Sequence, residues 1–242
     1  MIVYVHSHSG NRLEGLNLLD DLLPDVNLCV FDCSGSGLSD GEYTTLGLKE
    51  AEDLKSVIIY LKNHYNVGEI GLWGRSMGAV TCLLYDAKLR EDIEVSCMVL
   101  DSPFTDIRVL IGDTMKAMKN IPKWVTATAL LAISGTIMKK TGKDVLSLKP
   151  IKYVKNILTP ALFIVAREDV ITPECEVRKM YKKYKSEEKQ FYLIDGEHHS
   201  SREWEEIEYG IEFMKKHINK VIVNKRKSLA SGIQLGQDFR IN

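Results

Sequence analysis

The pentapeptide Gly74-Arg75-Ser76-Met77-Gly78 lies where a short apolar run gives way to a segment with helical spacing of apolar residues. It has the pattern G-x-S-x-G. The two glycines remove Cβ atoms that would clash in a tight turn, so Ser76 is held in a strained conformation with its hydroxyl projecting outward. The helix that begins at Met77 directs free N–H groups and the positive end of its dipole to the place where an oxyanion would form. The stretch therefore predicts a nucleophilic serine between a strand and a helix.

Strands and helices alternate on both sides of this turn. Besides the strand before Gly74, strand patterns rich in β-branched and aromatic residues occur at 2–5, 27–31, 95–100, 161–165 and 190–194. Helical spacing of apolar residues is found at 12–23, 46–65, 77–89, 173–184 and 203–217. Strands separated by helices predict an α/β fold with a doubly wound, mostly parallel sheet, here of six strands.

Residues 104–150 interrupt the alternation, because they contain no clear strand pattern. The apolar part of this region, 124–138, is shorter than the ~20 residues that a membrane span requires. We expect helices of a cap or lid over the site, with a buried structural helix as the alternative. The chain is thus divided into one domain at 1–220, with the cap at about 104–150, and a basic, polar tail at 221–242 that we expect to be disordered.

The composition is that of an ordinary globular protein. The chain has 242 residues, of which 45% are hydrophobic and 27% charged, and its net charge of -1 gives no electrostatic reason to expect a nucleic-acid partner. Its five cysteines are odd in number and lack C-x-x-C spacing, and Cys29, Cys82 and Cys97 have apolar neighbours, as reduced core cysteines do. Residues 1–5 show no signal peptide. These features favour a cytoplasmic location.

A serine nucleophile needs a base and a carboxylate that orients the base. In a doubly wound sheet these groups are expected at the carboxyl ends of strands. Asp169 follows the strand at 161–165 and His198 follows the strand at 190–194, which gives the order Ser, Asp, His. Glu168 is an alternative acid and His199 an alternative base.

The remaining candidates receive other roles. Asp101 also ends a strand but fits a cap or turn before Pro103, while His64 and His217 are expected to be solvated near helix ends. Two backbone N–H groups should form the oxyanion hole. We assign these to Met77, directly after the nucleophile, and to His8, in the turn after the first strand.

Several motifs together carry a family resemblance. They are residues 5–12 (VHSHSGNR) for the usual H-G-N-S-G, residues 32–39 (DCSGSGLS) for D-x-x-G-x-G-x-S, the elbow at 71–78, Asp101–Phe104, the Asp169 loop and residues 196–198. With these motifs, residues 3–214 resemble the α/β-hydrolase superfamily. The best match within it is to the serine-aminopeptidase-like serine hydrolases, which are similar to the α/β-hydrolase-domain depalmitoylases.

Two departures from the family pattern stand out. Ser7 replaces the glycine of H-G, and we expect its Cβ to narrow the oxyanion hole or to alter the preference for the acyl group. The family also has two further strands before the one at 2–5. We therefore expect a fold trimmed at that edge or an incomplete product, and an exposed edge would invite pairing with another chain.

The resemblance implies a serine hydrolase that cleaves a carboxylic ester or thioester of a small-molecule or acylated substrate, without a metal or cofactor. Two alternatives are an aminopeptidase-type peptidase and a catalytically silent binding protein. Residues 213–237 carry six Lys and Arg side chains and no acidic residue. Such a segment predicts weak, salt-sensitive contact with an anionic membrane surface.

Overall fold

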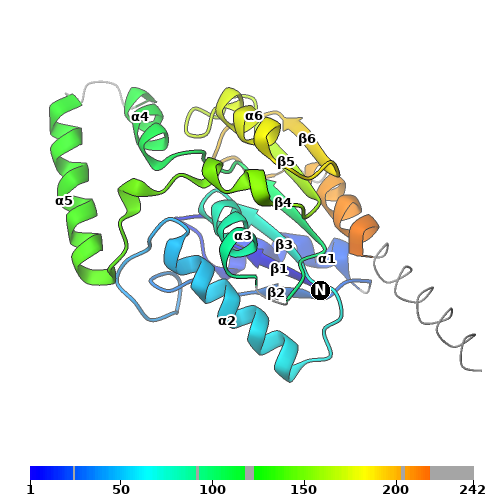
Figure 1. Cartoon of the computed structure of the whole chain (residues 1–242). Helices are drawn as coiled ribbons and strands as arrows, with labels where there is room; N and C mark the ends of the chain where they lie inside the picture. The colour runs from blue at the N-terminus through cyan, green and yellow to red at the C-terminus, as the bar shows by residue number, and fades with distance from the viewer. Residues whose placement is uncertain (24, 91–92, 118–122, 203–204, 219–242) are drawn as a thin grey trace, which may run out of the picture.

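Six parallel strands form a single sheet in the order β2-β1-β3-β4-β5-β6 (Figure 1). The computed structural model of the chain describes residues 1–23, 25–90, 93–117, 123–202 and 205–218. The strands are β1 (Ile2–Val5), β2 (Leu28–Val30), β3 (Gly71–Arg75), β4 (Cys97–Asp101), β5 (Ala161–Ala166) and β6 (Lys189–Ile194). The predicted parallel sheet is confirmed, and β3, which carries the elbow, lies between β1 and β4.

Helices cover both faces of this sheet. The α-helices are α1 (Leu19–Leu22), α2 (Leu48–His64), α3 (Met77–Lys88), α4 (Ile107–Ala117), α5 (Lys123–Thr141) and α6 (Glu174–Lys183), and residues 205–218 are also helical. In Figure 1, α2, α3 and α6 lie on the near side of the sheet, and the orange helix is 205–218. Short 3₁₀ helices are formed by Arg12–Leu18, Val145–Ser147, Pro150–Lys152 and Val154–Asn156.

The sheet separates two hydrophobic cores, because successive strand residues point to opposite faces. Val3 and Val5 belong to the core that contains the buried residues of α2, α3 and α6. Ile2 and Tyr4 belong to the other core, together with residues of α1 and of the helix at 205–218. Burial on both faces explains why β1, β4 and β5 are continuous apolar runs rather than alternating ones.

Some elements differ from the sequence-based expectation. The helix expected at 12–23 is a 3₁₀ helix (Arg12–Leu18) followed by the single turn of α1. Gly15 lies inside it against the Tyr4 ring and Val30, at a distance too short for a Cβ atom. This segment therefore packs more closely on the sheet than a regular helix with side chains could.

His217 is the clearest correction. We expected a solvated side chain, but it is 4% exposed. Its Nδ1 donates to the carbonyl of Phe213 at 2.8 Å, and its Nε2 lies 3.3 Å from a carboxylate oxygen of Glu188. The sequence showed only a polar neighbourhood along the helix, whereas the packing of residues 205–218 against the sheet buries this face. His64, in contrast, is exposed as expected and stacks on Tyr60.

The expected cap region holds two helices, α4 and α5, and no strand is found in its described residues, 104–117 and 123–150. α5 lies at the far left of Figure 1, to one side of the sheet. Whether these helices act as a lid stays a prediction. The tail at 221–242 lies outside the described residues, so the expectation about it also stays open.

Candidate active site

The turn between β3 and α3 has the strained geometry that the two glycines predict. Ser76 has φ 52° and ψ -110°, in a region that non-glycine residues rarely adopt. A Cβ on Gly74 would lie 2.5 Å from the amide nitrogen of Ala79, and a Cβ on Gly78 would lie 2.6 Å from the carbonyl carbon of Val5. Glycine is therefore required at both positions, and Ser76 projects at the carboxyl end of the sheet.

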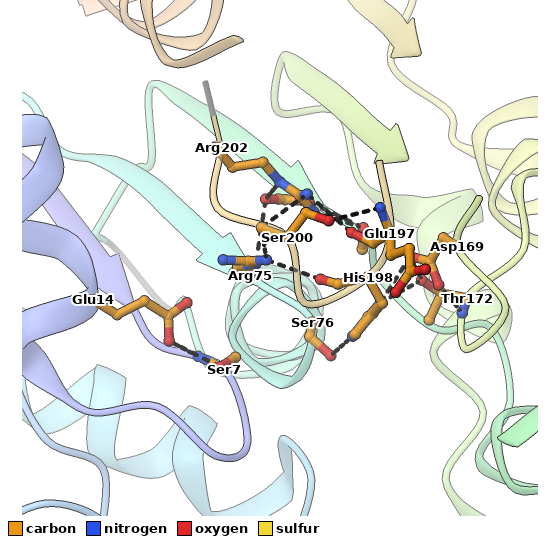
Figure 2. A network of polar contacts seen from close by, with 12 residues as sticks. Ser7, Glu14, Arg75, Ser76, Asp169, Thr172, Glu197, His198, Ser200 and Arg202 are labelled. Atoms are coloured by element: carbon orange, nitrogen blue, oxygen red, sulfur yellow. Dashed lines mark hydrogen bonds and ion pairs between the residues drawn. The ribbon is translucent and has the colours of Figure 1, made fainter. Parts of the chain in front are cut away.

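Three predicted residues form a hydrogen-bonded row at this edge (Figure 2). Ser76 Oγ lies 3.0 Å from Nε2 of His198, and Nδ1 of His198 lies 2.7 Å from Oδ2 of Asp169. The side chains of His198 and Asp169 are buried, with exposed fractions of 6% and 0%. The structure brings these residues together from loops after three different strands, β3, β5 and β6.

The Asp169 carboxylate is held by its own loop. Oδ1 accepts hydrogen bonds from the backbone N–H of Ile171 at 2.9 Å and of Thr172 at 2.7 Å, and Oδ2 accepts from the Thr172 hydroxyl at 2.7 Å. Burial alone would raise the pKa of Asp169, but the hydrogen bonds from His198 and Thr172 outweigh it and lower the pKa below its ordinary value. The carboxylate therefore stays ionised beside the imidazole.

Thr172 was not among the residues that sequence reasoning selected. Its hydroxyl also lies 3.2 Å from Nδ1 of His198, so it touches both partners of the acid–base pair. A signal for it exists in the sequence: a threonine three residues after Asp169 and directly before Pro173 fits a turn in which the aspartate accepts from its own loop.

The rival residues take other positions. Glu168 is exposed, and its Oε2 accepts from the backbone N–H of Gly196 at 2.7 Å, which ties the β5 loop to the β6 loop. His199 is exposed and stands edge-on to the His198 ring, with centroids 5.0 Å apart. Partial burial and the neighbouring His198 and Arg75 lower the pKa of His199. Neither rival joins the row that contains Ser76.

The two expected oxyanion donors begin at adjacent strand ends. β1 and β3 are paired with Val5 opposite Gly74, so the turn that contains His8 lies beside the elbow. That turn is closed by the Gly10 N–H, which donates to the Ser7 carbonyl at 3.0 Å. Met77 is the first residue of α3 and is buried, while His8 is exposed. Their roles as oxyanion donors stay predictions.

The backbone of Ser7 does not adopt the left-handed conformation that favours glycine. Among the described residues, the non-glycine positions with positive φ are Leu46, Ser76 and Ser102, so Ser7 is not one of them. Its hydroxyl and backbone N–H both donate to Oε2 of Glu14, at 2.8 and 3.1 Å. Figure 2 shows this pair at a distance from Ser76. The Ser7 side chain is thus engaged by Glu14, a contact that the sequence alone did not reveal.

The segment after β1, which contains His8 and Arg12, is also fixed to the loop after β2. Asp32 accepts from the backbone N–H and Nε of Arg12 at 2.6 and 2.8 Å, and from the N–H of Leu38 at 2.8 Å. Burial would raise the pKa of Asp32, but these bonds lower it to about 2. His6 accepts the Cys33 N–H at 3.1 Å, so both family motifs at this edge have a structural role.

A cavity of about 380 Å³ opens beside His198. Its walls come from the turn after β1, from the start of the 3₁₀ helix, and from the β3 and β6 loops, and most of them are polar. The lining residues are Ser7, Ser9, Gly10, Asn11, Leu13, Glu14, Arg75, His198 and His199. A space of this size and character suits a small polar group next to the imidazole.

No group of three or more His, Cys, Asp or Glu side chains in the part of the chain that the structure describes could hold a metal ion. Within the same residues, no helix is both long and apolar enough to cross a membrane.

The parallel sheet, the strained serine between β3 and α3, and a histidine after the last strand define the class of α/β-hydrolase folds. Comparison of the sequence gives the family. Residues 1–134 match the family model described as "alpha/beta hydrolase fold", which is more than half of the chain. The chain therefore belongs to the α/β-hydrolase fold family.

Several known proteins are similar to this chain in sequence or in structure. The uncharacterized protein YqkD of Bacillus subtilis is 31% identical over 81% of this chain, and the match spans 64% of YqkD's length. Pyrococcus furiosus esterase Pf2001 is similar in structure, with a TM-score of 0.70, 24% identity and coverage of 90% of this chain and 83% of that one. Paleococcus ferrophilus monoacylglycerol lipase is also similar in structure, with a TM-score of 0.68 and 19% identity. The match covers 89% of this chain and 94% of that one. At these identities, the structural similarities show the fold alone.

Proposed function

We propose that this chain is a serine hydrolase that cleaves a carboxylic ester or thioester through an acyl-enzyme intermediate. The observation that carries the proposal is the row of hydrogen bonds from Ser76 Oγ to His198 Nε2, at 3.0 Å, and from His198 Nδ1 to Asp169, at 2.7 Å. The esterase and lipase structures that share the fold support a hydrolytic reaction. Within the superfamily, we place the chain with the serine-aminopeptidase-like hydrolases.

Each residue of the row has a defined step. Ser76 Oγ forms a bond to the carbonyl carbon of the substrate while its proton passes to Nε2 of His198. The amides of Met77 and His8 donate to the negative oxygen that results. His198 then gives the proton to the departing alcohol or thiol as its bond to carbon breaks. Water then attacks the acyl carbon while its proton passes to His198. The bond from this carbon to Ser76 Oγ breaks as His198 returns the proton to Oγ, which releases the acid. Asp169 stabilises the charged imidazole in both halves of the reaction.

The ionised state of Asp169 suits this role. A carboxylate whose pKa is lowered remains negative at neutral pH and favours the imidazolium that forms during the reaction. It also fixes the tautomer with the proton on Nδ1, which leaves Nε2 free to accept from Ser76.

An aminopeptidase-type activity is the second candidate, because the Glu14 carboxylate lines the cavity beside His198 and could bind a substrate amine. Its two oxygens already accept from Tyr4, at 3.0 Å, and twice from Ser7. We therefore favour an ester or thioester. Comparison of an aminoacyl p-nitroanilide with the corresponding p-nitrophenyl ester distinguishes the two activities.

The cytoplasmic location is part of the proposal. All five cysteines lie in the part of the chain that the structure describes, and each is a free thiol. Burial raises the pKa of the Cys97 thiol to about 12, so this cysteine is an inert core residue. Such unpaired core cysteines suit a reducing compartment.

Labelling with an alkyl fluorophosphonate tests the proposal. We expect mass spectrometry to find the adduct on Ser76, and Ser76→Ala to lower the rate on a p-nitrophenyl ester by at least ~10³-fold. His198→Ala should lose activity similarly, while His199→Ala should keep most of it. A chain that stays unlabelled and inactive across esters of graded acyl length is a silent binding protein instead.

A further inference from the structure

The loop that carries His198 has little regular structure of its own. It follows β6 and turns at Gly196, which has φ 97°. Within the turn, Ser200 N–H donates to the Glu197 carbonyl at 3.2 Å, and Glu197 N–H donates to the Ser200 hydroxyl at 2.9 Å. These bonds shape the turn but do not fix it to the sheet. Because β6 is separated from β3 by two strands, other contacts must hold the imidazole at Ser76.

Arg75, the residue before Ser76, makes such contacts. Its Nη2 donates to the carbonyl of His198 at 2.9 Å and to the carbonyl of Ser200 at 2.7 Å. Figure 2 shows Arg75 reaching from the end of β3 to this loop. The backbone that bears His198 is thus tied to the backbone that bears Ser76 through adjacent residues of the elbow.

Asp101 forms a second tie from the neighbouring strand. It is paired with Arg75 in the β3–β4 register, and its backbone carbonyl accepts the Ser76 N–H at 2.8 Å. Its carboxylate accepts two hydrogen bonds of 2.8 Å from Arg202. We expected Asp101 to cap or turn the chain before Pro103, whereas its side chain forms this buried ion pair.

The Asp101–Arg202 pair is almost excluded from water, with side-chain exposures of 3% and 8%. Arg202 also lies within 3.4 Å of the carbonyls of Glu197 and Ser200. Its planar guanidinium is suited to a two-bond contact with a carboxylate, which fixes direction as well as distance. Arg75 thus ties the His198 loop to β3, and Arg202, near the end of the same loop, ties it to β4 through Asp101.

We propose that Arg75, Asp101 and Arg202 are positioning residues that hold the imidazole of His198 between Ser76 and Asp169. None of them touches the reacting atoms. Their effect is on geometry: if the loop loosens, the two hydrogen bonds of His198 are formed for a smaller fraction of the time. This inference rests on the proposed function, because it assigns a role in the same site.

The test compares Arg75→Met and Arg75→Lys with the wild type. Arg75→Met removes both hydrogen bonds to the loop and the 3.8 Å ion pair from Arg75 Nε to Asp101, while Asp101 stays paired with Arg202, so the buried carboxylate keeps a charged partner. We expect kcat to fall by ~10- to 100-fold, since small misplacements of a catalytic group have effects of that size, with KM within ~3-fold. Arg75→Lys retains the charge and one flexible donor group and should recover part of the loss.

A second readout does not depend on activity. The His198 Nδ1 proton, hydrogen-bonded to Asp169, should give a far-downfield proton NMR signal in the wild type. We expect this signal to broaden or disappear in Arg75→Met and to persist in Arg178→Met. Arg178 is the matched control, because it pairs with Glu174 on the exposed surface of α6.

An effect on catalysis is distinguished from an effect on folding when kcat is expressed per fluorophosphonate-labelled site. An Arg75→Met protein with wild-type kcat and an unchanged signal would overturn the inference. A second result would also overturn it: Arg75→Met melts at a lower temperature and fewer of its molecules are labelled, but its kcat per labelled site is that of the wild type. That result would show that Arg75 has a purely structural role. If the wild type itself neither hydrolyses esters nor is labelled, the proposed function fails, and the NMR signal still tests the positioning of His198.

The Asp101–Arg202 tie has its own variants. Arg202→Met alone removes the two shortest charged contacts of the buried Asp101 carboxylate and leaves it the 3.8 Å contact with Arg75, so this variant is expected to fold less well. The double variant Asp101→Asn/Arg202→Met removes both charges and the ion pair of Arg75 with Asp101, and it keeps the two hydrogen bonds of Arg75 to the loop. We expect it to fold and to show a kcat loss with little change in KM. Wild-type kcat in this folded double variant would remove Asp101 and Arg202 from the proposal.

Discussion

Gly78→Ala is the substitution for which the structure predicts the sharpest effect from a single methyl group. Gly78 lies in the first turn of α3, against the end of β1. A Cβ there would be 2.6 Å from the carbonyl carbon of Val5 and 2.8 Å from the carbonyl oxygen of His6. Both neighbours are backbone atoms, so no side-chain rotation can relieve the contact.

The size of the effect follows from these distances. Ordinary van der Waals contact begins near 3.4 Å, so the backbone must move by at least about 0.8 Å at the Val5 carbon, and by more at the Val5 carbonyl oxygen, which is the nearest atom. The movement separates the start of α3 from the turn after β1, which are the two expected sources of oxyanion donors. Overpacking of this kind costs ~1–3 kcal/mol of stability, and a misplacement near 1 Å lowers the rate by ~10²-fold.

Gly112→Ala provides the matched control. Gly112 is inside α4, and a Cβ there meets nothing within 4 Å. Alanine is favoured over glycine in a helix by ~0.5–1 kcal/mol, so this variant should be slightly more stable. At ~2–4 °C per kcal/mol for a chain of this size, the melting temperatures should move in opposite directions.

The assay measures kcat/KM on a short p-nitrophenyl ester, the rate of fluorophosphonate labelling, and thermal unfolding for both variants and the wild type. If Gly78→Ala kept kcat/KM within ~3-fold and melted with the wild type, the close approach of α3 to β1 would not matter for the oxyanion site. The reasoning from backbone contact would then be refuted.

Four further predictions concern separate contacts. Thr172→Val deletes the hydroxyl donor to Asp169, so the carboxyl pKa should rise towards its ordinary value and kcat on a p-nitrophenyl ester should fall ~3- to 10-fold. Asp32 has a folded pKa of about 2, so its stabilising contribution is complete above the unfolded value near ~4 and is lost as the pH falls through the folded pKa; urea unfolding from pH 6 to pH 2.5 should show a flatter pH dependence for Asp32→Asn. Ser7→Gly removes the hydroxyl bond to Glu14 and should lower stability by ~1 kcal/mol in thermal unfolding; its turnover should rise if the Ser7 Cβ narrows the oxyanion hole as expected, and unchanged kinetics on short and long esters would contradict that expectation. For the basic tail, liposome sedimentation with and without phosphatidylserine should show weaker binding for a chain that ends at Lys220 than for the full chain, and binding that is indifferent to salt would exclude the tail.

Local physics in the sequence was enough for the fold and for the elbow. The alternation of apolar strand and helix patterns predicted the six-stranded parallel sheet. A strand that is covered on both faces is apolar along most of its length, so it can be recognised in the sequence. The glycines around Ser76 predicted a strained turn, because the clash that excludes a side chain involves atoms only a few residues away or in the adjoining strand. Such short-range constraints can be read from a chain without its coordinates.

Tertiary structure decided which polar residues meet. Asp169 and Glu168 are neighbours in sequence, as are His198 and His199, and only the directions of two loops place one of each pair in the row with Ser76. The same holds for Asp101, whose partner Arg202 lies about a hundred residues away along the chain. Side-chain direction in irregular loops depends on strand register and on distant hydrogen bonds. The sequence by itself therefore determined the sheet and the strained serine. The meeting of the ends of β3, β4, β5 and β6 at one edge determined which residues join Ser76 in the row of hydrogen bonds and which arginines contact the His198 loop.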